Sequence, residues 1–467
     1  MSASLLFLTG KLAENSLKRM LESMQPAEFR YQVEQLGVSV AALMTPELIA
    51  RRLPDARGSD RILVPGLCRG DLAPLAAKYG VPVDRGPEDL KDLPQYFGRD
   101  GKTPDLSRYD VRIFAEIVEA PHLTVEGILA HAARYRTQGA NVIDLGCLPN
   151  TPFPHLEDAI RALHEAGHQV SVDSMDSADL LRAGHAGADY LLSLTEKTLW
   201  IADEVASTPV LIPARSGSLP SLYRAIDALQ ERGKIFLADP ILDPLPFGLA
   251  DSIVRYHRLR KRFPDIQIMM GVGNLTELTD ADTTGINAIL FGIVAELGIN
   301  AVLTTSVSPH ACNAVAEADM ARRMMYAARQ DQRLPRDYSN GLLGLHDRRP
   351  FTYSAQEIAE LAAQIKDGNF RIQVSEEGVH IYNRDGLHSD TDPFRLYPHL
   401  QVGDDAAHAF YLGVELARAQ IAWQLKKRYH QDEELQWGCN SAQEDARGRV
   451  AHRESALKVK RGKPGKT

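Results

Sequence analysis

The chain has 467 residues, of which 44% are hydrophobic and 24% are charged, and its formal net charge is -8 at pH 7. This length predicts about two to four domains, and the acidic balance argues against a nucleic-acid-binding protein, which usually has a basic domain. The four cysteines lie far apart and form no CxxC pair, so we expect reduced thiols in a cytoplasmic protein and neither a disulfide framework nor a zinc site.

The first hundred residues alternate short apolar runs with amphipathic stretches. The pattern predicts strands at SLLFLTG (4–10), VSVAALM (38–44) and DRILVPG (60–66), and helices at ENSLKRMLESM (14–24) and PELIARRL (46–53). Such alternation is typical of a small α/β domain with a parallel sheet, which we place at residues 1–108. No apolar run in the chain is long enough to span a bilayer.

From residue 111 the alternation becomes regular. Continuously apolar segments predict strands at 111–118, 141–146, 169–174, 189–195, 209–214, 234–239, 266–271 and 300–305. Helical patterns or helix-sized gaps follow each of them, so residues 109–332 are predicted to form a closed (β/α)8 TIM barrel. An open doubly wound sheet is the alternative, but eight units without a break favour closure.

After residue 350 the pattern changes. A helix is predicted over 354–366, a β-hairpin within 369–383, and a long amphipathic helix over 406–429. These elements predict a separate α+β domain at residues 350–439. The basic, aperiodic residues 440–467 are expected to be a disordered tail.

Polar side chains close the predicted barrel strands, at the end where a TIM barrel carries its active site. Acids and an amide around one mouth, without a His–Cys pair, indicate a pocket for a hydrogen-bonding heterocycle, because a carboxylate accepts two parallel N–H bonds. Each residue also has a structural interpretation, as a helix cap, a strand end or a turn residue. The residues concerned are Glu116, Glu119, Asp144, Asp173, Ser193, Asp239 and Asn274.

Three segments that include predicted barrel strands resemble a known family. GANVIDLG (139–146), QVSVDSMDSADLLRAGHAGADYLLSL (169–194) and IFLADPILDPLPFG (235–248) are similar to successive strand motifs of the pterin-binding barrels. That group includes dihydropteroate synthase and the methyltetrahydrofolate-binding methyltransferases. The chain as a whole is most similar to dihydropteroate-synthase-like proteins of organisms that make tetrahydromethanopterin.

The resemblance implies roles for individual residues. Asp173 would hold the pterin ring, Asp239 would be the sixth-strand acid, and Asn274 matches the asparagine with which the methyltransferase branch contacts the pterin. Asp144 and Ser193, from the strand-end pattern, complete the predicted pterin-binding set. The sequence names no catalytic residue and no metal ligand.

The chain departs from the synthases where they bind diphosphate. It lacks their sixth-loop lysine, their seventh-loop Ser-Arg-Lys and the Arg-x-His at strand eight. Arg215, Ser216 and Ser218 precede a predicted helix, and with Ser306 they are the predicted phosphate-binding residues. An ordinary capped loop is the alternative. His310 is a weaker candidate, and the Thr-Gly-Lys at 9–11 is not a full phosphate-loop motif.

The resemblance implies a transferase of tetrahydromethanopterin biosynthesis. It would join 6-hydroxymethyl-7,8-dihydropterin diphosphate to 4-(β-D-ribofuranosyl)aminobenzene 5'-phosphate and release diphosphate, with Mg²⁺ as a candidate cofactor. The alternatives are a methyltransferase acting on a methyl-tetrahydropterin and a non-catalytic pterin carrier or scaffold. We expect small-molecule partners, no nucleic acid, no membrane, and a homodimer as in other pterin barrels.

Overall fold

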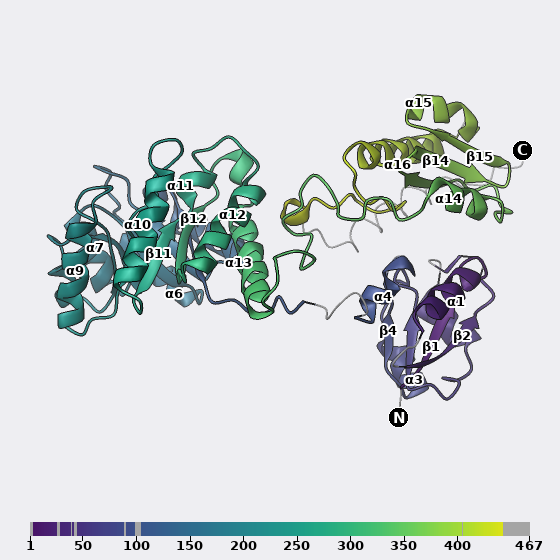
Figure 1. Ribbon diagram of the computed structural model, residues 1–467, viewed down its shortest axis with the longest axis horizontal. Helices are drawn as coiled ribbons and strands as arrows, with labels where there is room; N and C mark the ends of the chain where they lie inside the picture. Colours follow the sequence, from purple (N-terminus) through teal and green to yellow (C-terminus); the bar gives the residue numbers. More distant parts are fainter. Residues whose placement is uncertain are drawn as a thin grey trace, which may run out of the picture. The chain divides into compact units, whose positions relative to one another are not determined.

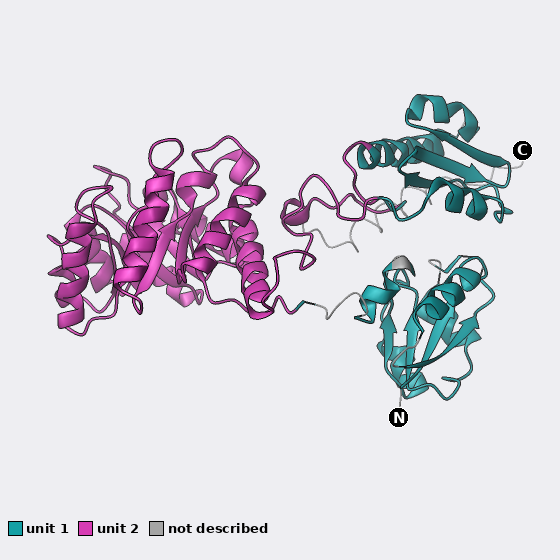
Figure 2. Ribbon diagram, viewed as in Figure 1, with its two compact units in different colours: residues 1–104, 351–423, 429–431 teal, residues 105–350, 424–428, 432–467 magenta. Residues whose placement is uncertain are grey.

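The structure is a computed structural model that describes residues 3–25, 29–38, 40–41, 44–87, 90–98, 104–403 and 405–441. Its elements are coloured along the chain in Figure 1. The chain divides into unit 1 (1–104, 351–423 and 429–431) and unit 2 (105–350, 424–428 and 432–467), which Figure 2 distinguishes by colour. The predicted domain boundaries stay predictions, and residues 442–467 of the predicted tail lie outside the described residues.

Unit 2 is built on a closed barrel of eight parallel strands. The last strand pairs with the first, so no strand edge is left open. This closure confirms the predicted (β/α)8 barrel and excludes the open doubly wound sheet. In chain order the strands are β5 (Arg112–Ile117), β6 (Val142–Gly146), β7 (Gln169–Asp173), β8 (Tyr190–Leu194), β9 (Thr208–Leu211), β10 (Leu237–Ala238), β11 (Gln267–Gly271) and β12 (Ala301–Thr305).

Helices surround this barrel and bury their apolar sides against the outer faces of its strands. The short strands are apolar on both faces because one face meets the helices and the other meets the barrel interior. The helices are α5 (Val125–Thr137), α6 (Leu156–Glu165), α7 (Ser177–His185), α8 (Ile201–Glu204), α9 (Leu219–Glu231), α10 (Leu249–Arg262), α11 (Gly273–Thr276), α12 (Thr283–Glu296) and α13 (Ala314–Gln330), with the single turns η3 (Ala120–His122) and η4 (Pro309–Ala311).

An apolar layer fills the barrel interior below its mouth. It consists of Phe114, Val142, Tyr190, Leu192, Val210, Leu237, Met269 and Ala301. Side chains alternate along a strand, so a residue two positions further on points to the same side. Counting forward from Phe114, Val142 and Leu237 therefore brings Glu116, Asp144 and Asp239 into the interior, above the apolar layer.

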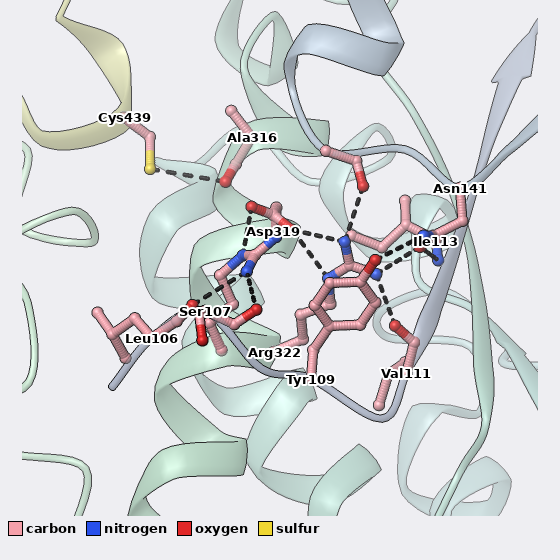
Figure 3. Close-up of polar contacts among 12 residues, drawn as sticks. Leu106, Ser107, Tyr109, Val111, Ile113, Asn141, Ala316, Asp319, Arg322 and Cys439 are labelled. Carbon is pink, nitrogen blue, oxygen red and sulfur yellow. Dashed lines mark hydrogen bonds and ion pairs between the residues drawn. The ribbon is translucent and has the colours of Figure 1, made fainter. Parts of the chain in front are cut away.

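A buried arginine ties α13 to the start of the barrel (Figure 3). Arg322 is 2% exposed, and its Nη1 donates to the Val111 carbonyl at 2.6 Å and to Asn141 Oδ1 at 2.5 Å. Another guanidinium nitrogen pairs with Asp319 at 2.5 Å, and the group lies 3.6 Å above the ring centre of Tyr109. The segment before β5, the segment before β6 and α13 are thus held at one point.

The N-terminal part of unit 1 has a parallel sheet of strand order β2-β1-β3-β4. The strands are β1 (Ser4–Thr9), β2 (Arg30–Gln35), β3 (Arg61–Val64) and β4 (Val83–Arg85), and the helices are α1 (Glu14–Ser23), α2 (Pro46–Arg52), α3 (Ala73–Tyr79), α4 (Leu93–Tyr96) and the turn η2 (Leu90–Asp92). The predicted strand at 38–44 is wrong, because its described residues are not in a strand. The second strand lies at β2, an edge strand whose polar, half-exposed side chains hide it from an apolar pattern.

The later part of unit 1 has an antiparallel sheet. Its strands are β13 (Arg371–Ser375), β14 (Gly378–Asn383) and β15 (Gly386–Asp390), and its helices are α14 (Ala355–Ala362), α15 (Pro393–Leu396), α16 (Ala406–Gln424) and the turn η5 (Tyr397–Leu400). The pairing of β13 with β14 confirms the predicted hairpin, while β15 was not predicted. The turn η6 (Gly438–Asn440) returns to unit 2. Within the described ranges, no helix combines the length and hydropathy that a membrane span needs.

Candidate functional site

Four neighbouring strands bring polar side chains to one level of the barrel mouth. Thr305 is the register partner of Glu116, Glu116 of Asp144, and Asp144 of Ser171. This polar level lies directly above the apolar layer. Asp173, two residues after Ser171 on β7, lies one level nearer the opening.

Asp144 forms the floor of the mouth. The residue is 0% exposed, and its Oδ1 accepts a 2.5 Å hydrogen bond from the Ser171 hydroxyl. Its Oδ2 is buried and has no partner among the described residues. Burial raises the pKa of this carboxyl well above its usual range, and the negative charges of Asp173 and Glu116 raise it further. Asp144 is therefore an acid held at the bottom of the pocket.

Asp173 and Ser193 are brought together by a bulge. The register between β8 and β9 shifts between Leu191 and Leu194, so β8 has one residue more than its neighbour. The Ser193 hydroxyl donates to Asp173 Oδ1 at 3.1 Å, and Oδ2 has no hydrogen bond from a described residue. Burial raises the pKa of Asp173, and the bond from Ser193 opposes that shift. One carboxylate oxygen remains for a ligand.

Asp239 follows β10 and has a similar asymmetry. Its Oδ1 accepts from the Tyr256 hydroxyl at 2.6 Å and from the Ile241 N–H at 2.7 Å, whereas no described residue donates to Oδ2. Burial raises the pKa of Asp239 to about 6, and these two hydrogen bonds lower it in part. The donors fix the carboxylate and leave one oxygen directed elsewhere.

Asn274 lies in α11, three residues after the end of β11. Its Nδ2 donates to the Leu242 carbonyl at 2.8 Å, in the loop that follows Asp239. Its Oδ1 accepts no hydrogen bond from a described residue. The amide therefore ties two mouth loops together, and its Oδ1 and the second N–H of Nδ2 remain for a ligand.

Glu116 belongs to the same mouth, although the predicted set leaves it out. A Cβ on Gly146 would lie 2.7 Å from Glu116 Oε1, so the glycine on the next strand provides the room that this carboxylate occupies. Burial raises its pKa to about 7, with further contributions from Asp173 and Glu277. Glu116 is among the strand-closing polar residues named from the sequence, but the family resemblance gave it no role, so it is absent from the predicted pterin-binding set.

The predicted phosphate residues after β9 lie on an exposed loop. Arg215 and Ser216 are exposed, and Ser218 is the N-cap residue of α9 without a side-chain capping bond. Ser216 donates to Asp243 Oδ1 at 3.1 Å, so this loop is joined to the loop after β10. Ser306 follows β12 and is separated from this loop by the two intervening strands.

The loop after β12 is held by the carboxylate of Glu277, the residue that follows α11. Glu277 accepts hydrogen bonds from the N–H groups of Val307 and Ser308 at 2.8 and 2.9 Å. The Ser306 hydroxyl is buried and has no partner among the described residues. The ring of His310 contacts the Thr276 carbonyl at 3.1 Å, so this histidine is a structural residue here.

The mouth is strongly acidic. The loops that lead from each barrel strand to the next helix contain only two cationic residues, Lys197 and Arg215. Among the described residues no three His, Cys, Asp or Glu side chains are placed to hold a metal ion. These residues therefore do not fit a protein-held Mg²⁺, and we derive no step through one.

Comparisons with known proteins match separate parts of the chain. Residues 3–88 match a family model described as a family of unknown function, DUF6513. The uncharacterized protein MJ0107 of Methanocaldococcus jannaschii is 27% identical, over 92% of this chain and 98% of that protein.

Among solved structures, the dihydropteroate synthase of Yersinia pestis with a pterine-sulfa conjugate is 18% identical, with a TM-score of 0.38, and the match covers 49% of this chain and 95% of that one. The dihydropteroate synthase of Xanthomonas albilineans in complex with 7,8-dihydropteroate is 20% identical, with a TM-score of 0.37 and the same coverage.

Proposed function

We propose that the barrel mouth binds a pterin and that the protein is a pterin-dependent transferase. The observation that carries this proposal is the shared arrangement of Asp173 and Asp239, each of which has one oxygen held by the protein and one to which no described residue donates. A pterin presents adjacent ring and exocyclic N–H donors, which such acceptors match. The motif resemblance of both residues supports the same ligand.

The reaction that we propose joins 6-hydroxymethyl-7,8-dihydropterin diphosphate to 4-(β-D-ribofuranosyl)aminobenzene 5'-phosphate, a step of tetrahydromethanopterin biosynthesis. The arylamine nitrogen forms a bond to the exocyclic methylene carbon, the carbon–oxygen bond breaks, and diphosphate leaves with the electron pair. The amine must also lose a proton. Glu116, whose pKa of about 7 allows it to be ionised at neutral pH, is the base that we assign to this step.

Anion binding would fall to the loop after β9. Arg215, Ser216 and Ser218 lie there, and Arg215 is one of the two cationic side chains in the loops from barrel strands to helices. Ser306 would contribute a hydroxyl from the loop after β12. In such an acidic mouth the diphosphate needs a counter-ion, so we expect Mg²⁺ to enter as part of the substrate complex.

The test measures pterin binding and turnover separately. Binding of 6-hydroxymethylpterin, followed by its fluorescence, should weaken at least about 30-fold (about 2 kcal/mol) in Asp173→Asn, because a neutral amide accepts less strongly and presents N–H donors to the ligand. Asp158→Asn, on the outer surface of α6, is the matched control. Unchanged affinity in Asp173→Asn would remove the pterin assignment.

A second candidate is a methyltransferase acting on a methyl-tetrahydropterin. Two observations favour it: Asn274 matches the methyltransferase motif, and Glu277 fills the amides of the loop after β12, where a diphosphate would otherwise find donors. Arylamine-dependent diphosphate release supports the synthase, and methyl transfer from a reduced methylpterin supports the alternative. Tight pterin binding with neither reaction would indicate a carrier. A homodimer stays a prediction for all three.

A further inference from the structure

The loop from Asp239 to α10 contains a strained residue. Ile241 has a φ of +68°, and it is the one β-branched residue among the described non-glycine residues with positive φ. Isoleucine rarely adopts this conformation, because its branched side chain crowds the backbone. Such a residue persists only where its surroundings hold it, and it is often found at functional sites.

Arg255, from the middle of α10, holds the carbonyl groups of this turn. It is 6% exposed; its Nε donates to the Pro240 carbonyl at 3.3 Å and its Nη2 to the Ile241 carbonyl at 2.8 Å. The same Nη2 pairs with Asp243 Oδ2 at 2.6 Å. The Asp243 N–H donates a hydrogen bond to the Ser252 hydroxyl at 2.8 Å. One guanidinium thus holds three groups of this loop, namely the carbonyls of Pro240 and Ile241 and the carboxylate of Asp243.

The strained turn determines the direction of the Asp239 carboxylate. The Ile241 N–H lies in the same peptide plane as the Pro240 carbonyl that Arg255 holds, and it reaches back to Asp239 Oδ1 at 2.7 Å. Tyr256, the residue after Arg255, donates to the same oxygen at 2.6 Å. Both donors act on Oδ1, so Oδ2 is the oxygen left for a ligand. The left-handed φ of Ile241 lets its carbonyl meet the same guanidinium, so loss of Arg255 would free this peptide plane to rotate and release the carboxylate.

The same loop joins its two neighbours. Asp243 accepts from Ser216 in the loop after β9, and the Leu242 carbonyl accepts from Asn274 in α11. Three mouth loops, which carry predicted pterin and phosphate residues, are therefore connected through residues 239–243. Nothing in the order of these residues along the sequence indicates that connection.

We propose that Arg255 and Asp243 are positioning residues, which hold Ile241 in its strained conformation so that Asp239 presents Oδ2 to the pterin. Neither residue touches the ligand. This inference rests on the proposed function for the identity of the ligand, whereas the restraint of the turn is a property of the chain alone.

The test uses the full-length chain with Arg255→Gln and Asp243→Asn, and Arg258→Gln on the exposed side of α10 as the matched control. The probe is 6-hydroxymethylpterin, and the thermal unfolding temperature is measured on the same samples. Each variant should bind at least 10-fold more weakly at temperatures where it is folded. The double variant should bind the probe no more weakly than the weaker of the two single variants, because the two residues act as a pair. A lower unfolding temperature with unchanged affinity would overturn the proposal.

A rescue variant separates this role from ordinary packing. Glycine adopts positive φ without strain, so Ile241→Gly in the Arg255→Gln background should recover at least half of the lost affinity in logarithmic terms. No recovery would show that Arg255 does not act through this turn.

Hydrogen exchange of the Ile241 N–H gives a readout without a ligand. It should be at least 10-fold faster in Arg255→Gln than in the wild type, and equal rates would overturn the proposal. If the wild type binds no pterin, the proposed function fails, while the exchange rates still decide whether Arg255 restrains the turn.

Discussion

Glu116 has surroundings that few surface acids share. It lies inside the barrel, on the level of Asp144, in the space that Gly146 leaves open. Its ionised form loses solvation and meets the negative charges of Asp173 and Glu277. Proton binding at Glu116 is therefore favoured by folding, which makes the stability of the barrel depend on pH.

The sign of that dependence follows from the raised pKa. The carboxyl has a pKa of about 7 in the folded chain against an ordinary value of 4.5, so the stabilisation is present at low pH and is lost as the pH rises through about 7. Glu116→Gln should therefore stabilise the protein at pH 8 by about 1–3 kcal/mol relative to the wild type, and by much less at pH 5.

Thermal unfolding at both pH values checks this prediction. Glu119→Gln, an exposed acid in the adjoining loop, is the control and should show no such change with pH. An equal effect of Glu116→Gln at pH 5 and pH 8 would mean that Glu116 is not the titrating group.

At the scale of elements, Arg322 joins α13 to the start of the barrel. Truncation to alanine leaves Asp319 and the Val111 carbonyl without their buried partner, so Arg322→Ala should lower the free energy of unfolding of unit 2 by about 3–5 kcal/mol. Arg329→Ala, also on α13, removes an exposed pair with Asp110 and an exposed hydrogen bond to the Ala295 carbonyl, and should cost less than about 1 kcal/mol. Denaturant unfolding followed by calorimetry or circular dichroism compares the two; similar losses would contradict this account.

The elements themselves were predictable to different degrees. The barrel strands were readable because a strand buried on both faces carries an unbroken apolar run, as in Ile268–Met270 of β11. Strand β10 keeps only two residues of the predicted 234–239, because the chain enters the sheet at Leu237 and leaves it at Asp239. Strand β2 was missed because its edge position leaves polar side chains exposed. The second strand was therefore predicted at the apolar run 38–44.

The candidate site was predictable only where it follows the strands. Asp173 and Asp239 end apolar strands, and that position alone placed them at the mouth. Glu277, Arg255 and Tyr256 act from helices and loops far along the chain, and their partners become visible only when the barrel closes. Asn274 was predicted as a ligand residue, and its amide also proves to link two loops.

At the scale of the whole molecule, charge is unevenly distributed. The acids of four strands meet at the barrel mouth, and the loops that lead from barrel strands to helices carry only Lys197 and Arg215 as cations. An anionic ligand is therefore repelled by most of the mouth, and its binding depends strongly on the remaining cations.

This distribution predicts that Arg215→Ala weakens inhibition by inorganic diphosphate about 10-fold or more, because a charge-assisted contact is lost. Binding of uncharged 6-hydroxymethylpterin should stay within about 2-fold, and the difference should shrink at high salt. Arg258→Ala, on the exposed side of α10, is the matched control. Equal diphosphate inhibition in Arg215→Ala and the wild type would remove Arg215 from the phosphate set.

The path of the chain out of unit 2 and back has a further consequence. The Asp347 N–H donates to the Lys426 carbonyl, the Arg428 N–H donates to Asp347, and His346 contacts the Leu425 carbonyl. The departing and returning segments are thus hydrogen-bonded side by side, and residues 351–423 enter and leave at one place. In topological terms residues 351–423 are an insertion whose two ends are already joined by hydrogen bonds within unit 2, so the path of the barrel chain does not depend on the length of the insertion.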